Sequence, residues 1–428
     1  MQRYHLVTLG CPKNEVDSDK VEGTLLADGM SAVDDAGDAD LIVVNTCAFI
    51  ESARQESIDT ILALDDQRRE GAKLVVTGCM AERYGSELAD VLPEVDSVAG
   101  FGVPVNSTVS SAAVPVSLGP TRGSKSAERP IPVFDLLNLP RAASSRPWAY
   151  VKIAEGCDRK CGFCAIPSFR GAQRSRSIDD IVAEVEQLGA REVILVAQDL
   201  ASFGNDTGNR GGIVSLVRTV SDTVDRVRLL YLYPSDLTDP LVDAIVDSGV
   251  VYFDLSLQHV SSSLLRRMRR WGNGQKFLSR IEAIRRLAPD AAFRSNFIVG
   301  YPGETEDDHA ELLEFVEAAQ LDWCGFFSYS RESGTYAADL DGVVAPELMA
   351  ERLTELTEIQ DRITTERRAA LIGSTIEVLV DDAGIGRSHR EAPEIDGIVN
   401  LPGDLEVGEL HLVRVTDSAG PDLVADRV

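Results

Sequence analysis

The chain has 428 residues, of which 44% are hydrophobic, so it is long enough for two or three domains that each bury a core. No apolar run reaches the roughly 18–20 residues that cross a bilayer, and we predict no membrane partner. The first residues lack the apolar core of a signal peptide, which predicts a cytoplasmic protein. The net charge of −27 excludes broad electrostatic capture of nucleic acid; it would attract a basic protein or simply reflect a solvated acidic surface.

The first hundred residues alternate strand and helix patterns, as a doubly wound parallel sheet requires. Strands are predicted at residues 4–9, 40–46 and 73–77, with one helix ending near residue 28 and another at 51–70. The runs DLIVVNT and KLVVT are apolar throughout, which is typical of strands buried on both faces.

A second alternating series follows a stretch rich in Pro, Ser, Gly and Ala. We predict strands at 149–154, 192–197, 227–233, 252–257, 293–299 and 324–329, and helices at 178–188, 239–247, 275–287, 306–319 and 345–371. Six strand–helix units indicate a partial barrel, whose active site should lie at the carboxyl ends of the strands. The last part has short strands (TIEVLVDD, EIDGIVNLPG, ELHLVRVTD) and turn residues, which predicts a small all-β barrel.

The predicted fold class is therefore α/β with a terminal β-barrel, in four segments. They are an N-terminal doubly wound domain at 1–103, a linker at 104–147 with one short strand at 131–134, a partial barrel at 148–371 and the β-barrel at 372–428.

Cys157, Cys161 and Cys164 form a Cys-x3-Cys-x2-Cys triplet directly after the first predicted strand of the partial barrel. Three thiolates within eight residues can ligate three irons of a 4Fe–4S cluster and leave the fourth iron open to a small molecule. A zinc site would want a fourth Cys or His nearby. The spacing is the signature of the radical S-adenosylmethionine (SAM) superfamily, whose open iron binds SAM, and it predicts these residues as cluster ligands and SAM-binding residues.

Cys11, Cys47 and Cys79 each stand just after a predicted parallel strand. Since the carboxyl ends of neighbouring parallel strands meet at one edge, three thiolates placed there can converge on one point. We interpret them as ligands of a second cluster; the alternative is three buried cysteines at strand ends.

Gln198 and Gly300 follow predicted strands of the partial barrel and are candidates for contact with the cofactor, although a plain turn would also explain each. His259, at another strand end, is either a site residue or a satisfied structural histidine. Cys324 is interpreted as a packed core thiol.

Arg170, Arg174 and Arg176 lie in the loop after Cys157, Cys161 and Cys164, where they either receive an anionic group or are solvated.

The chain resembles the methylthiotransferase family over essentially its whole length: a three-cysteine domain, a radical SAM partial barrel and a C-terminal TRAM β-barrel. Gly10-Cys11-Pro12-Lys13-Asn14 and Ala392-Pro393-Glu394-Ile395-Asp396-Gly397 are similar to the RimO-type branch, which modifies an aspartate of ribosomal protein S12. Leu257-Gln258-His259 and Tyr301-Pro302-Gly303-Glu304 are similar to family motifs of the barrel.

The resemblance implies two 4Fe–4S clusters and two uses of SAM. The cluster on Cys157, Cys161 and Cys164 would reduce SAM to a 5′-deoxyadenosyl radical that abstracts hydrogen from the β-carbon of the aspartate. Such a carbon is beyond the reach of a side-chain base, so a cofactor radical is needed. The other cluster would carry the inserted sulfur, and a second SAM the methyl group. An electron donor and a sulfur source are implied partners; no catalytic residue beyond the cluster ligands is assigned.

Two departures from the family pattern stand in the barrel. Leu200, Ala201 and Phe203 occupy positions where the family has hydroxyl residues and a Tyr, which would make the pocket more apolar. Ser256 stands where a Pro is usual.

The choice between a protein and an RNA substrate depends on charge. Between Gly373 and Val428 stand twelve acidic and four basic residues, a balance of −8 that would repel phosphate and suit a basic ribosomal protein or the small ribosomal subunit. We therefore expect the C-terminal barrel to dock a basic protein and not to bind RNA directly. The alternatives are methylthiolation of a modified adenosine in tRNA, as in the MiaB-type branch, and a non-enzymatic iron–sulfur electron-transfer or sensing protein.

Overall fold

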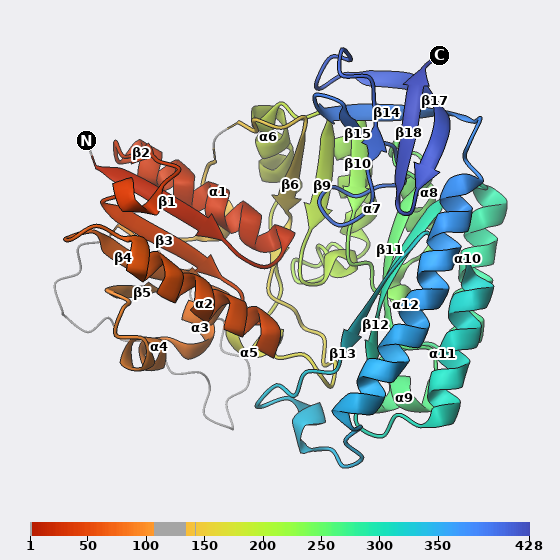
Figure 1. The fold of residues 1–428 in the computed structure, drawn as a ribbon, viewed down its shortest axis with the longest axis horizontal. Helices are drawn as coiled ribbons and strands as arrows, with labels where there is room; N and C mark the ends of the chain where they lie inside the picture. Colours follow the sequence, from red (N-terminus) through yellow and green to blue (C-terminus); the bar gives the residue numbers. More distant parts are fainter. Residues whose placement is uncertain (1, 107–133, 142) are drawn as a thin grey trace. The chain divides into compact units, whose positions relative to one another are not determined.

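The computed structural model describes residues 2–106, 134–141 and 143–428 (Figure 1). It divides into two units: residues 1–142, 155–158 and 165–176 form the first, and residues 143–154, 159–164 and 177–428 form the second. The strand predicted at 131–134 lies outside the described residues except for its last position. No helix in the described ranges is long and apolar enough to cross a membrane.

Five parallel strands form the sheet of the first unit, in the order β2-β1-β3-β4-β5 (Figure 1). Every residue of the central strand is buried, as its apolar run predicts. The strands are β1 (Arg3–Thr8), β2 (Ser31–Ala32), β3 (Leu41–Thr46), β4 (Lys73–Gly78) and β5 (Ser97–Ala99). The predicted doubly wound sheet is confirmed, with β2 and β5 as additional short edge strands.

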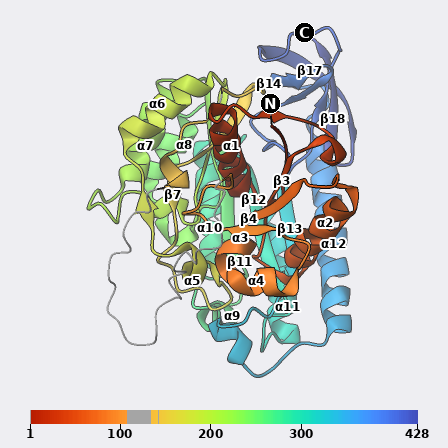
Figure 2. The ribbon, with the colours of Figure 1, turned by 90° about the vertical axis from the view of Figure 1, so that its left-hand side faces the viewer.

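Helices α1 (Pro12–Ala27) and α2 (Glu51–Gln67) lie on opposite sides of β3 (Figure 2). Alternate strand residues supply the two cores, because successive side chains point to opposite faces. Val43 packs with the α1 side, and Val44 with the α2 side. The remaining elements of this unit are η1 (Ala36–Asp38), α3 (Cys79–Tyr84), α4 (Ser86–Val91), η2 (Leu136–Asn138), α5 (Ile166–Arg170) and β8 (Arg174–Ser175), while β7 (Ala154–Glu155) ends in it.

Residues 104–106 and 134–141 of the predicted linker belong to the first unit, whereas residues 143–147 belong to the second. Val105 and Leu136 are buried in the α1-side cluster, together with Tyr4 and Val21. The Lys20 ammonium, which is fully buried, donates a hydrogen bond of 2.6 Å to the backbone oxygen of Leu137.

The second unit contains the six predicted strands, in two three-stranded parallel sheets of order β10-β9-β6 and β11-β12-β13. The strands are β6 (Trp148–Lys152), β9 (Glu192–Val196), β10 (Arg226–Leu229), β11 (Tyr252–Gln258), β12 (Ala292–Val299) and β13 (Trp323–Ser328). A partial barrel is therefore confirmed.

The strand predicted at 227–233 ends early, at Leu229, because Tyr231 adopts a left-handed conformation with φ of 66°. Beyond it, Leu232 alone bridges to Leu255 of β11 and links the two sheets. The Ser256 N–H donates to the Leu232 oxygen at 2.9 Å. A Pro at position 256 would remove this donor, so the departure from the family pattern supplies a bond between the sheets.

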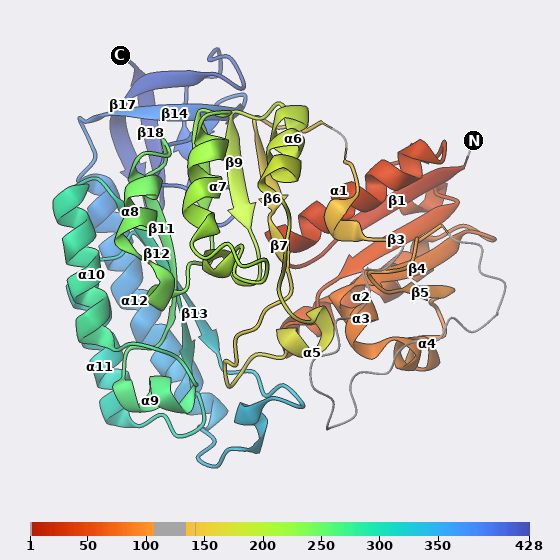
Figure 3. The same ribbon diagram turned by 180° about the vertical axis from the view of Figure 1, so that it is seen from behind.

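Helices cover the outside of the strands, with α6, α7 and α8 along one sheet (Figure 3) and α10, α11 and α12 along the other (Figures 1 and 3). The helices are α6 (Ile178–Leu188), α7 (Gly212–Ser221), α8 (Asp239–Val246), α9 (Ser262–Arg267), α10 (Gly274–Leu287), α11 (Glu306–Ala319) and α12 (Pro346–Ala369), with short turns η3 (Leu200–Ser202), η4 (Pro234–Asp236) and η5 (Tyr336–Asp339). Leu200 and Phe203, two of the departures from the family pattern, are buried in the main core.

The C-terminal strands form a closed barrel of order β14-β15-β16-β18-β17, which confirms the predicted β-barrel. They are β14 (Thr375–Asp382), β15 (Ile385–Arg387), β16 (Val399–Asn400), β17 (Leu410–Ala419) and β18 (Asp422–Arg427). The strand predicted from EIDGIVNLPG is wrong except for Val399–Asn400. Its first residues instead bind the amino ends of the partial-barrel strands.

Residues 387–396 form hydrogen bonds with all six strands of the partial barrel; they accept from five strands, and Arg387 donates to Glu192 of β9. Glu192, Tyr252 and Trp323 are the first residues of their strands, and Tyr150, Arg228 and Arg294 are the third. The donor or carboxylate residues are Tyr150 (to Pro393 O), Glu192 (with Arg387), Arg228 (to His389 O), Tyr252 and Arg294 (to Asp396) and Trp323 (to Arg390 O). The segment therefore covers the end of the barrel opposite the carboxyl ends of its strands.

A buried cluster of charges forms the centre of this contact. The Glu192 carboxylate accepts from Arg228 Nε at 2.7 Å and from Arg387 Nη1 at 3.1 Å, and all three side chains are 0–3% exposed. Burial alone would raise the pKa of Glu192, but the charges of Arg228, Arg387 and Arg226 lower that pKa to about 2. Glu192 is thus ionised and joins the partial barrel to the C-terminal β-barrel.

We predict that Glu192→Gln destabilises the protein by about 3–5 kcal/mol, because it removes a counter-charge from buried arginines. Glu409→Gln is the matched control: it also breaks a pair between the β-barrel and the core, with Arg191, but both side chains are more than 40% exposed, and we expect less than about 1 kcal/mol. Urea unfolding followed by tryptophan fluorescence measures both changes, since Trp148 and Trp323 are buried beside the contact. Equal losses would contradict the assigned role.

His259, which follows β11, is fully buried, and its Nδ1 accepts from the Ser261 N–H at 3.1 Å. Desolvation lowers the pKa of the imidazole to about 4, despite the nearby Asp308. The structure therefore shows a neutral histidine in the core whose Nε2 has no hydrogen-bond partner among the described residues, and its role as a site residue or as a structural histidine stays a prediction.

The pKa of His259 predicts an acid-dependent loss of stability. Between about pH 6.5 and pH 4 the unfolded chain binds a proton that the folded chain does not, so this contribution is complete above pH 6.5 and falls by about 3 kcal/mol towards pH 4. His259→Gln should have a correspondingly shallower dependence of unfolding free energy on pH over that range, and an unchanged slope between pH 7 and 8. If the unfolding free energies of the wild type and His259→Gln fell in parallel from pH 6.5 to 4, the assigned role of His259 in this pH dependence would be refuted.

Candidate functional site

The three strand-end cysteines lie at the carboxyl edge of the N-terminal sheet. Thr46 of β3 pairs with Gly78 of β4, so Cys47 and Cys79 are the next residues at the same level of the sheet. Cys11 follows the end of neighbouring β1 and precedes α1. Gly10, at φ of 98°, packs against Cys47 so closely that a Cβ there would lie 2.7 Å from the Cβ of Cys47. Parallel register thus brings together residues that are far apart in sequence.

Asn14 ties the loops of this edge to one another. Its side-chain amide donates to the backbone oxygens of Leu9 at 2.9 Å and Thr46 at 3.0 Å, so it joins the loops that carry Cys11 and Cys47. The Asn45 amide donates in turn to the Asn14 backbone oxygen at 2.8 Å. Asn14 is fully buried, and these bonds fix the positions of the cysteine loops.

Arg170 is the buried cation of the same site. Its Nη2 donates to the Cys79 sulfur at 3.0 Å and to Asn14 Oδ1 at 2.9 Å. Its Nη1 faces the carboxylates of Glu155 and Asp17. Burial opposes the charge, but Cys79, Glu155 and Asp17 raise the pKa of Arg170 far above its usual value, so it stays protonated.

The three thiols influence one another. Burial, together with the nearby Cys79 and Cys11, raises the pKa of Cys47 to about 11, although the Phe49 N–H and Arg170 act in the opposite direction. Burial also raises the pKa of Cys79, opposed by Arg170. For Cys11, burial is outweighed by Lys13 and the Asn14 N–H, and its pKa is lowered. The other two cysteines thus contribute to the raised pKa of Cys47, and Cys11 contributes to that of Cys79.

The donor set fits an iron–sulfur cluster better than a single ion. In the described part of the chain, no three Cys, His, Asp or Glu side chains are arranged to hold one metal ion. A cubane cluster makes a different demand, because each thiolate binds a separate iron. Three thiols at one edge, of which Cys47 and Cys79 are buried and Cys11 is half-buried, match that demand.

The division between the two units falls within the triplet of Cys157, Cys161 and Cys164. Cys157 belongs to the first unit, where its N–H donates to the Gly171 oxygen at 3.0 Å. Cys161 and Cys164 belong to the second, where the Cys164 N–H donates to the Cys161 oxygen at 3.2 Å. All three fall within eight consecutive residues.

Two arginines surround the second-unit part of the triplet. Arg270 donates from Nη1 to the Cys161 sulfur at 3.3 Å. Arg159 donates from Nε to Asp199 at 2.6 Å and also pairs with Asp236. Both guanidiniums lie against the ring of Tyr233, 4.3 and 3.9 Å from its centre. Within the second unit, Cys161 therefore lies beside Arg270, whose guanidinium shares the Tyr233 ring with that of Arg159.

The two other predicted cofactor residues also lie after strands of the partial barrel. Gln198 is half-buried after β9. Gly300 follows β12, its N–H donates to Glu304, and a Cβ there would lie 2.1 Å from the sulfur of Met349 on α12. Close packing against α12 explains that glycine, and contact of Gln198 and Gly300 with a cofactor stays a prediction. Cys324 on β13 packs against the main core, where burial raises the pKa of its thiol.

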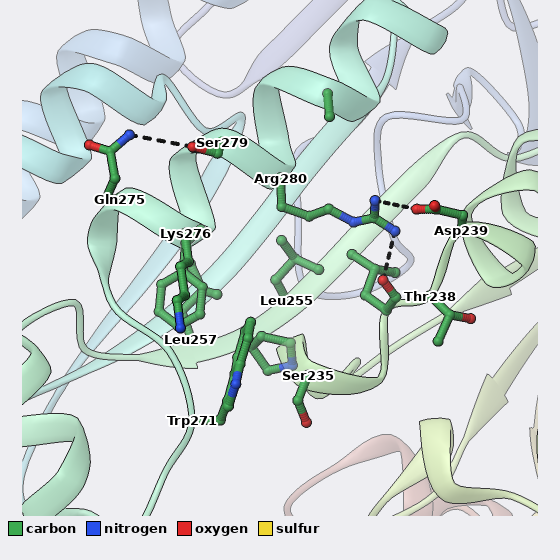
Figure 4. Close-up of a pocket in the computed structure, with 14 residues that line it drawn as sticks. Ser235, Thr238, Asp239, Leu255, Leu257, Trp271, Gln275, Lys276, Ser279 and Arg280 are labelled. Atoms are coloured by element: carbon green, nitrogen blue, oxygen red, sulfur yellow. Dashed lines mark hydrogen bonds and ion pairs between the residues drawn. The ribbon is translucent and has the colours of Figure 1, made fainter.

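A cavity of about 670 Å³ opens elsewhere in the second unit, between the start of α8, β11 and α10 (Figure 4). Its polar side chains bind one another: Arg280 donates to Asp239 at 2.6 Å and Gln275 to Ser279 at 3.4 Å. Leu255 forms part of its apolar wall. None of the cysteines lines this cavity.

Sequence reasoning missed several of these functional neighbours. The role of Arg270 has no local signal, since it lies 109 residues from Cys161. Asn14 stands in the Gly-Cys-Pro-Lys-Asn run, where a polar residue three positions after a cysteine was the available signal. The prediction left Arg170, Arg174 and Arg176 open between binding an anion and solvation. Arg170 and Arg176 are buried, and Arg174 pairs with Asp135 at 2.6 and 2.7 Å.

Three family models match the chain in order. They are the uncharacterized protein family UPF0004 at residues 3–100, the radical SAM superfamily at residues 151–316 and the TRAM domain at residues 372–428. The radical SAM signature and the three-part organisation expected from the resemblance are confirmed by these matches.

Among solved structures, the radical S-adenosylmethionine methyltransferase TsrM from Kitasatospora setae is similar, with a TM-score of 0.55 over 85% of this chain and 89% of that one. The identity of 14% makes this a likeness of fold alone.

Curated relatives are similar over nearly the whole length. Ribosomal protein uS12 methylthiotransferase RimO of Kineococcus radiotolerans is 41% identical, over 98% of this chain and 96% of its own, and RimO of Saccharopolyspora erythraea is 41% identical, over 99% and 94%. RimO of Cutibacterium acnes is 40% identical over 99% of this chain. At this identity and coverage, the chain belongs to the RimO family of radical SAM methylthiotransferases.

Proposed function

We propose that this enzyme inserts sulfur and a methyl group at the β-carbon of an aspartate in ribosomal protein uS12, in the cytoplasm, drawing on an electron donor and a sulfur source. The observation that carries the proposal is 41% identity to RimO over 98% of the chain, with both cysteine triplets in the chain. The four-segment division at residues 103, 147 and 371 is part of the same proposal.

We assign the six cysteines as ligands of two 4Fe–4S clusters: Cys157, Cys161 and Cys164 of one, and Cys11, Cys47 and Cys79 of the other. When bound, the cluster on Cys157, Cys161 and Cys164 supplies the electron that splits SAM, and the cluster on Cys11, Cys47 and Cys79 supplies the sulfur. The residues around them hold the ligands: Asn14 fixes two loops, and Arg170 and Arg270 donate to cysteine sulfurs.

Part of the acidic excess of the C-terminal barrel is neutralised within the protein itself. Five of the twelve acidic residues of the C-terminal barrel pair with arginines of the core within the same unit. They are Glu377 (with Arg226), Glu391 (with Arg368), Glu394 (with Arg146), Asp396 (with Arg294) and Glu409 (with Arg191). The protein substrate is therefore supported by family membership, while the remaining acidic excess still disfavours contact with RNA phosphate.

Separate removal of the two cysteine triplets tests the ligand assignment. Replacing Cys157, Cys161 and Cys164 together by Ala should abolish release of 5′-deoxyadenosine from SAM in reduced, reconstituted protein. Replacing Cys11, Cys47 and Cys79 should retain that release but abolish the methylthio product on uS12. Cys324→Ser is the control and should retain both. Methylthio product from a protein without the N-terminal triplet would overturn the assignment, and absence of 5′-deoxyadenosine from the intact enzyme would favour a non-enzymatic iron–sulfur protein.

The substrate is tested in cells with and without the gene. Mass spectrometry of uS12 should detect a methylthio mass gain that disappears on deletion and returns with the wild-type gene, but not with either triple variant. Nucleoside analysis of tRNA from the same cells should be unchanged. Loss of a tRNA methylthio group with unmodified uS12 in both strains would favour the tRNA alternative.

A further inference from the structure

Arg170 follows Cys157, Cys161 and Cys164 in the chain, yet it binds Cys79, which belongs to the strand-end triplet. We propose that Arg170 is a positioning residue of the strand-end cysteine site, which fixes the Cys79 sulfur and raises the reduction potential of the cluster held there. The inference rests on the proposed assignment of Cys11, Cys47 and Cys79 as ligands.

The contact with Cys79 is direct and shielded from water. Arg170 Nη2 lies 3.0 Å from the Cys79 sulfur, and its side chain is 3% exposed. A charge-assisted hydrogen bond of this kind is stronger than a neutral one, and burial strengthens it further. Cys79 is the first residue of α3, so a fixed sulfur also fixes the start of that helix.

The guanidinium is held by other residues of the same unit, which leaves it little freedom to turn. Glu155 accepts from Nη1 with both carboxylate oxygens, at 3.0 and 2.9 Å. Asn14 accepts from Nη2 at 2.9 Å, and the ring of Phe101 lies 4.1 Å from the guanidinium carbon. Asp17 adds a second carboxylate at 3.3 Å. This enclosure directs Nη2 towards the sulfur and compensates the buried charge.

The direction of the effect on potential follows from charge. Reduction adds negative charge to a cluster and its thiolates, and a nearby cation with an N–H donor stabilises the reduced form more than the oxidised form. Hydrogen bonds to the sulfurs are among the features that set the potential of iron–sulfur clusters. Removing Arg170 should therefore make the cluster harder to reduce and its Cys79 ligand easier to lose.

The chain connection gives the contact a second consequence. Glu155 stands two residues before Cys157, and Arg170 stands six residues after Cys164. Ala165 and Phe169, in the same segment as Arg170, are buried in the core of the N-terminal sheet. The segment around the SAM-binding triplet thus also completes the surroundings of the sulfur-carrying triplet.

The test uses the full-length chain with Cys157, Cys161 and Cys164 replaced by Ala, so that only the N-terminal cluster assembles. On this background Arg170→Gln, Arg170→Lys and Arg174→Gln are compared with the parent. Arg174 is the matched control: it lies four residues further on and pairs bidentately with Asp135. Iron and sulfide content, the midpoint of a redox titration followed by electron paramagnetic resonance, and the rate of iron loss to a chelator are measured.

We expect Arg170→Gln to shift the midpoint to a more negative potential and to speed iron loss by about tenfold, as for other groups that hold metal ligands. Arg170→Lys, which keeps the charge without the planar fork, should fall between Gln and the parent and provides the comparison if Arg170→Gln does not fold. Arg174→Gln should match the parent.

Three outcomes would overturn the inference or its basis. A midpoint and iron-loss rate unchanged in Arg170→Gln would refute the role of Arg170 alone. Equal shifts in Arg170→Gln and Arg174→Gln would assign the effect to general disturbance of the segment. A parent background that binds no cluster at all would instead refute the ligand assignment of the proposed function.

Discussion

The N-terminal site depends on the register of the parallel strands, because that register places their carboxyl ends side by side. Hydrogen bonding between parallel strands fixes which residues lie side by side, and the pairing of Thr46 with Gly78 puts the next residue of each strand, a cysteine, at the same height. Cys11 reaches the same edge from β1. A slip of register by one residue would separate the sulfurs and also turn every strand residue to the other face. The two apolar cores that fix the register therefore also fix the chemistry.

Buried arginines recur wherever distant parts of the chain must be held together. Arg170 joins a segment after the second triplet to the N-terminal sheet, and Arg226, Arg228 and Arg294 bind the β-barrel. The planar guanidinium suits this use, because it can donate to several acceptors in fixed directions and remains charged when buried. In an acidic protein, the acids that bind these arginines are unavailable to a partner.

Much of the fold follows from local patterns in the sequence. Apolar runs such as LIVVNT identify buried parallel strands, and alternation with amphipathic segments identifies the sheet and the partial barrel. The pattern failed where long-range contacts override it: Tyr231 bends the chain and ends β10, and residues 394–398 bind other strands instead of forming one. The cysteines could be predicted because their spacing and strand-end positions are visible in the sequence. The contact of Arg270 with Cys161 could not, since the two residues lie 109 positions apart, and neither could the bond from Asn14 to Thr46, which spans 32 positions.

The segment at residues 387–396 follows all six strands of the partial barrel in the chain. During synthesis from the amino terminus, those strands exist before the residues that cover their amino ends. Until then Glu192, Arg228 and Arg294 can remain hydrated, and the unfinished barrel presents charges there in place of an apolar surface. The amino ends of the partial-barrel strands therefore gain these hydrogen-bond partners only after residues 387–396 have been made.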